Sequence, residues 1–76
     1  MHKELELGVE DLESELEEER LAELLKGLHG VHGVRLVRGG GVHILYNPLG
    51  ITADELCETV RRSGFTVKTR QATGER

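Results

Sequence analysis

Apolar and polar residues alternate along four short segments of the chain and follow helical spacing along two others. Alternation with period 2 is typical of a strand with one buried face, whereas apolar residues at i, i+3, i+4 and i+7 are typical of a helix with one buried face. The order of these segments predicts strand, helix, strand, strand, helix, strand. The predicted elements are strands at about 3–9, 31–37, 42–47 and 65–68, and helices beginning near 15 and 53.

The first predicted helix has a start signal and a clear buried stripe. Ser14 and Glu17 have the spacing of a capping box, in which the serine hydroxyl accepts a first-turn N–H and the glutamate reaches back to the serine N–H. Leu12 and Leu16 lie off the stripe, and we expect them to cover the N-terminal end of the helix. Gly30 is the expected left-handed cap. The stripe consists of Leu21, Leu24, Leu25 and Leu28.

The second predicted helix, residues 53–63, begins with a capping box formed by Thr52 and Glu55. Ile51 and Leu56, on either side of this box, occupy the two positions of a hydrophobic staple. It ends at Gly64. Three consecutive glycines, 39–41, separate two alternating runs and indicate a hairpin.

The order of the elements predicts an α+β, ferredoxin-like βαββαβ sandwich, an antiparallel four-stranded sheet with two helices on one face. Right-handed crossovers then bring residues 10–14, 38–41 and 64–65 to the same end of the sheet. We expect one domain at residues 1–70, and a flexible tail or the start of a linker at 71–76.

Composition and charge narrow the function classes. A chain of 76 residues has room for one core, which disfavours an enzyme with an enclosed pocket. Residues 1–23 hold ten acids and two bases, and the rest of the chain holds four acids and eight bases. Net negative charge and two aromatic residues argue against nucleic-acid binding. No apolar run approaches the roughly 20 residues that span a bilayer, so we expect a cytoplasmic protein without membrane insertion. No serine, histidine and acid are placed to suggest a catalytic triad, so we expect a non-catalytic protein.

Residues 21–65 resemble the heavy-metal-associated domain, the module of copper chaperones and of the cytoplasmic extensions of metal-transporting P-type ATPases. The resemblance implies the same ferredoxin-like fold and a link to metal trafficking or transport. It rests on the leucine stripe, Gly30-Val31, Val34, Tyr46-Asn47-Pro48, Ile51 to Leu56, and Gly64-Phe65.

The family binds soft metal through a Gly-Met-x-Cys-x-x-Cys loop, which this chain departs from. Counting back from Gly30 without gaps puts Leu12 at the methionine position, and Ser14 and Glu17 at the two cysteine positions. Copper(I) selects thiolate and thioether ligands, so a hydroxyl and a carboxylate are poor substitutes. We therefore expect a degenerate binding module with an interaction or regulatory role and without copper binding. The expected partner is a protein, either a metal-transporting ATPase or a second copy bound through the sheet.

The alternative function is metal binding with altered selectivity, for zinc or a harder divalent ion. Its candidate ligands are Glu13, Glu17 and His43, although acidic residues at a helix start are explained equally by the helix dipole. We expect His43 on the sheet face that the helices leave open, with Arg35, Val37 and Leu45.

Two other groups contain residue types that can form sites. His29 and His32 straddle the end of the first predicted helix, where favourable contact with the helix C-terminus explains His29 as well as a metal site does. Cys57 lies in the apolar stripe of the second predicted helix and is expected to be a small core residue.

Overall fold

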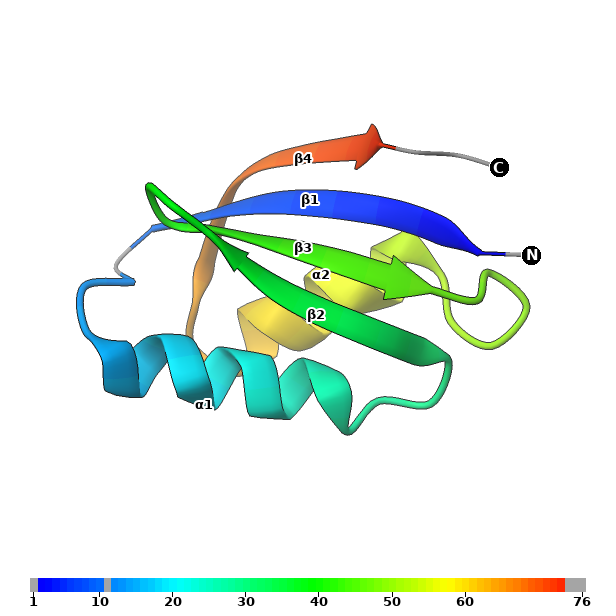
Figure 1. Ribbon diagram of the computed structural model, residues 1–76, viewed down its shortest axis with the longest axis horizontal. Helices are drawn as coiled ribbons and strands as arrows, with labels where there is room; N and C mark the ends of the chain where they lie inside the picture. Colours follow the sequence, from blue (N-terminus) through cyan, green and yellow to red (C-terminus); the bar gives the residue numbers. More distant parts are fainter. Residues whose placement is uncertain (1, 11, 74–76) are drawn as a thin grey trace.

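The computed structural model describes residues 2–10 and 12–73 and has the predicted order of elements. Asp11 and residues 74–76 lie outside the described residues. The strands are β1 (Lys3–Glu10), β2 (Val31–Val37), β3 (Gly41–Tyr46) and β4 (Thr66–Thr73), and the helices are α1 (Glu15–Lys26) and α2 (Ala53–Arg62). The four strands form an antiparallel sheet in the order β2-β3-β1-β4. Both helices lie on the same face of this sheet (Figure 1). The ferredoxin-like βαββαβ prediction is therefore confirmed.

The core is a single apolar layer between the sheet and the helices. Every second residue of β1 and β3 points into it, and none of these six side chains is more than 5% exposed. The helices supply the other wall through their buried stripes, which confirms the predicted faces. The core residues are Leu5, Leu7, Val9, Leu21, Leu25, Val42, Ile44, Tyr46, Ile51, Leu56, Cys57 and Val60.

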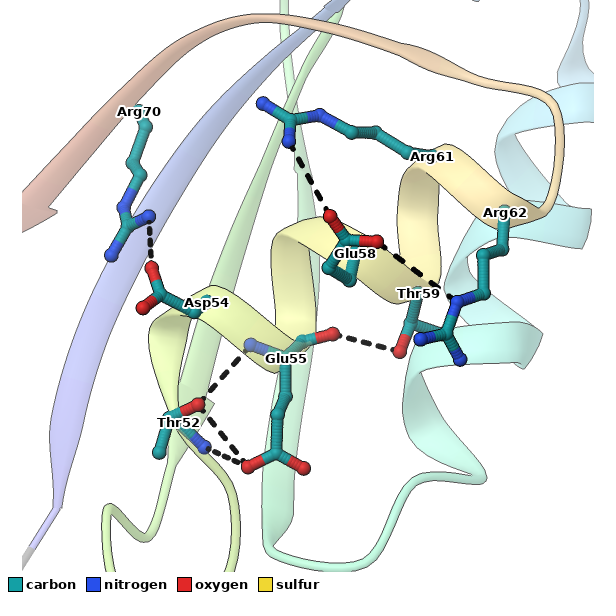
Figure 2. Close-up of polar contacts among 8 residues, drawn as sticks. All are labelled: Thr52, Asp54, Glu55, Glu58, Thr59, Arg61, Arg62 and Arg70. Carbon is teal, nitrogen blue, oxygen red and sulfur yellow. Dashed lines mark hydrogen bonds and ion pairs between the residues drawn. The ribbon is translucent and has the colours of Figure 1, made fainter.

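Helix α2 is fixed at both ends by local hydrogen bonds. Thr52 accepts a hydrogen bond from the Glu55 N–H at 3.1 Å, and the Glu55 carboxylate accepts one from the Thr52 N–H at 3.3 Å, so the predicted capping box is complete (Figure 2). At the other end the Ser63 hydroxyl donates to the Thr59 carbonyl at 3.0 Å. Ile51 and Leu56 both belong to the core, as a hydrophobic staple requires.

The end of α1 differs from the prediction. The helix stops at Lys26 with Gly27 as its C-cap, in a right-handed conformation with φ of −78°. Gly30 instead lies in the turn before β2, with φ of +91°, and its carbonyl accepts a hydrogen bond from the Asn47 N–H at 2.7 Å. A left-handed glycine is thus needed, but to bring this turn against the β3–α2 loop rather than to cap the helix.

The last strand is longer than expected. β4 continues to Thr73 and pairs with β1, with Ala72 opposite Leu5 and Thr73 opposite Glu4. Residues 71–73 are therefore strand and not tail. Among the described residues, no helix is long and apolar enough to cross a membrane.

Two glycines with similar backbone angles provide a test of the close contact at Gly30. A Cβ at Gly30 would lie 3.0 Å from the backbone of Gly50, whereas Gly39, with φ of +96°, has nothing within 4 Å. We expect Gly39→Ala to lower the free energy of unfolding by about 1 kcal/mol, through backbone strain alone. Gly30→Ala adds a clash and should cost about 2–4 kcal/mol. Urea unfolding of both variants measures the difference, and equal losses would contradict the close-contact explanation.

Candidate functional site

The loop between β1 and α1 meets the β2–β3 hairpin at one end of the sheet, here called the loop end (Figure 1). The Val9 N–H donates to the Gly40 carbonyl at 2.7 Å, which ties the hairpin tip to the end of β1. Phe65 packs partly buried against the core. The contact between the first two loops is as predicted. A shallow depression at the loop end is lined by Val9, Glu10, Leu12, Glu13, Glu18, Gly39, Gly40 and Lys68.

Ser14 and Glu17, the two positions that the resemblance assigns to cysteines, serve the start of α1. The Ser14 hydroxyl accepts a hydrogen bond from the Glu17 N–H at 3.2 Å. It also donates to the Glu17 carboxylate at 3.4 Å, so this carboxylate binds the serine hydroxyl and not, as predicted, the serine N–H. The first capping box is therefore only half formed. Both side chains are used in starting the helix.

The two leucines before the stripe behave differently. Leu12 packs partly buried against the core, whereas Leu16 is 67% exposed. The prediction was right for Leu12 and wrong for Leu16, because Leu16 lies on the side of α1 that faces away from the sheet.

The expected ligand set Glu13, Glu17 and His43 is not brought together. Glu13 lines the depression at the loop end, and Glu17 lies in the first turn of α1. His43 alternates with the buried residues of β3, so it lies on the open face of the sheet, away from both helices. The suggestion that His43 assists Glu13 and Glu17 is wrong for this geometric reason. Within residues 2–10 and 12–73, no three His, Cys, Asp or Glu side chains form a group that could hold a metal ion.

His43 has a different neighbour, which the sequence analysis missed. Its Nε2 lies 2.9 Å from a carboxylate oxygen of Glu4, and the two side chains are 17% and 31% exposed. Glu4 is in β1, one step diagonal to His43, because Glu6 is the residue directly opposite. The signal was available once β1 and β3 were paired in register, since alternation places Glu4 and Glu6 on the face of His43.

A second missed pair joins the start of α2 to β4. Arg70 Nη1 donates to Asp54 Oδ1 at 2.6 Å across the edge of the sheet (Figure 2). This hydrogen bond raises the pKa of the Arg70 guanidinium. Both side chains are largely exposed, so the pair contributes little stability. It escaped prediction because β4 was expected to end before Arg70.

The remaining candidates fit structural roles. Cys57 is 3% exposed within the core, as expected. The ring of His32 makes an edge contact with that of His2, with centroids 4.5 Å apart. A Cβ at Gly50 would lie 3.5 Å from the His29 ring, which places His29 beside the β3–α2 loop.

Comparison with solved structures finds close matches to this fold. The N-terminal domain of a potential copper-translocating P-type ATPase from Bacillus subtilis, in its Cu(I)-loaded state, has a TM-score of 0.82 and 23% identity, over 93% of this chain and 92% of that chain. Oxidized MerP from Ralstonia metallidurans CH34 has a TM-score of 0.80 and 12% identity, over 91% and 100%. A structure from Bacillus anthracis str. Ames has a TM-score of 0.83 and 20% identity, over 90% and 97%. The chain shares the fold of these domains. No family model and no curated protein matches the sequence.

The two helix starts allow the role of Ser14 to be measured against that of Thr52. We expect Ser14→Ala to lower the free energy of unfolding by about 0.5–1 kcal/mol, through loss of one capping bond. Thr52→Ala removes a complete capping box and should cost about 1–2 kcal/mol. Urea unfolding measures both values, provided that the slope of the unfolding free energy against urea concentration is the same in the variants as in the unaltered protein. A larger loss for Ser14→Ala would mean that Ser14 does more than cap the helix.

Proposed function

We propose that this chain is a non-catalytic binding module of the heavy-metal-associated type that no longer binds soft metal at its loop. The observation that carries the proposal is the hydrogen bond between Ser14 and Glu17 at the start of α1. In the resembled family these positions hold the cysteines that bind the metal. Here they hold a hydroxyl and a carboxylate, which are poor ligands for copper(I).

The fold supports the same proposal. Of the three solved structures matched above, one is named as the Cu(I)-loaded domain of a potential copper-translocating ATPase. The match extends along more than nine-tenths of both chains. The buried Cys57 cannot replace the missing thiolates, because it lies within the core.

The remaining role for such a module is recognition of a protein. The partner is either a metal-transporting ATPase or a second copy of this chain. The first turn of α1 holds three acids, Glu15, Glu17 and Glu18, whose negative charge is stabilised by the positive end of the helix dipole. The acidity of the loop end therefore has a structural cause without a bound cation.

A competition assay tests the loss of soft-metal binding. We expect the purified, reduced protein to leave copper(I) on a chromogenic chelator at submicromolar free metal, because it has no accessible thiolate. The double variant Ser14→Cys, Glu17→Cys should remove copper(I) from the same chelator, since it restores two thiolates at the start of α1.

The control for this assay is the single variant Ser14→Cys, which offers one accessible thiol and should bind much more weakly than the double variant. Stoichiometric copper(I) binding by the unaltered protein would overturn the proposal. A rise in melting temperature with zinc or another divalent ion would instead support the alternative through Glu13 and Glu17, because a ligand of the native state raises its stability.

A further inference from the structure

The face of the sheet opposite the helices has no other described element packed against it (Figure 1). We call the part of it formed by β1, β2 and β3 the open face and define it by Glu4, Glu6, Gly33, Arg35, Val37, His43 and Leu45. It carries apolar side chains between charged ones, and a depression of about 380 Å³ lies between Arg35, Leu45 and Glu4. The Glu4–His43 pair forms one wall of this depression.

Charges of opposite sign flank the centre of the open face. Arg35 of β2 and Glu6 of β1 both lie directly opposite His43 of β3, so the three residues form one row across the sheet. Within the described part of the chain, neither the Arg35 guanidinium nor the Glu6 carboxylate has an ion-pair or side-chain hydrogen-bond partner. Within one copy, β3 separates them by two strand spacings, roughly 10 Å, and both side chains project from the same face rather than toward each other.

We propose that the open face binds a second copy of this chain. The two-fold axis would run parallel to β3, midway between the two facing sheets. Such an axis lays β2 of one copy over β1 of the other and keeps each row facing the same row. Arg35 of each copy then faces Glu6 of the other copy, so the dimer has two identical Arg35–Glu6 contacts. Two packed sheets lie about 10 Å apart, within reach of an arginine and a glutamate side chain that approach from opposite sides.

The neighbouring row is complementary in shape. Leu45 faces Leu45 of the second copy, which buries the most central apolar side chain of the open face. Gly33, opposite Leu45 in the register, faces Glu4 of the second copy. Since Gly33 has no side chain, its position leaves room for a carboxylate that His43 already holds. The same symmetry thus pairs the charges and fills the depression.

The size of the contact predicts a weak dimer. Three strands about 20 Å long and about 5 Å apart give a footprint of roughly 300 Å² per copy. Stable complexes bury about 1,200–2,000 Å² in total, so we expect dissociation constants of roughly tens to hundreds of micromolar. The proposal identifies the partner that the proposed function leaves open, and it rests only on the view that this is a protein-binding module.

Charge reversal at the two residues tests both the surface and its symmetry. In sedimentation equilibrium from about 10 μM to about 1 mM, the unaltered protein should dimerise reversibly. Arg35→Glu should set two carboxylates against each other at each of the two contacts, and Glu6→Arg should set two guanidinium groups against each other. Each variant alone should therefore lose association at least about tenfold. An equimolar mixture of the two variants should recover it, because one contact of the mixed dimer then joins two reversed side chains of opposite charge and the other joins the original pair.

The mixture also shows that both variants are folded, since an unfolded chain would not associate with its counterpart. Arg62→Glu on α2, whose side chain is 79% exposed and lies on the helical side, is the matched control and should dimerise like the unaltered protein. A protein that stays monomeric at the highest concentration overturns the proposal, as does association that survives each single reversal or fails to return in the mixture. None of these outcomes affects the copper assay, so the two proposals fail independently.

Discussion

The fold depends on a single apolar layer that the sheet shares with both helices. Alternation in β1 and β3 sends six side chains into this layer, and two helical stripes close it from the other side. All residues of this core are apolar, and among the described residues no charged or polar side chain is buried. Burial of apolar area is therefore the main stabilising term, and the register of β1 and β3 cannot slip by one residue without exposing the layer.

This constraint also places the sites. Because the side chains that point into the core alternate with those that do not, the same register that buries Leu5 and Ile44 sets Glu4, Glu6 and His43 on the opposite face. The topology places the loop end, because the end of β1 and the β2–β3 hairpin lie at the same end of the sheet. A hydrogen bond from the Val9 N–H to the Gly40 carbonyl joins them there. The open face and the loop end therefore both follow from the single apolar core and from the register in which β1 and β3 pair.

Local signals in the sequence were enough to predict most of the fold. They failed where contacts between residues far apart in the sequence determine where an element ends. Ser14 and Thr52 marked the helix starts because capping uses residues three apart. Gly30 was misassigned because its left-handed backbone serves contact with the β3–α2 loop, which no local pattern reveals. The end of β4 was missed for a similar reason: its exposed polar residues show little alternation, and pairing with β1 holds them in the sheet.

The candidate site was harder to predict than the fold because a ligand set requires side chains to converge. His43 was a candidate helper of Glu13 and Glu17, but alternation in β3, which also predicted its place on the open face, directs it away from the helices, and there it pairs with Glu4. At the loop end the acids spread around a helix start, where the dipole accounts for them. On the open face, opposite charges lie in one row and remain apart because β3 separates them. The opposite charges of this surface do not pair within one copy but match under a two-fold rotation, which favours a second copy as its partner, whereas the helix dipole already accounts for the acids of the loop end.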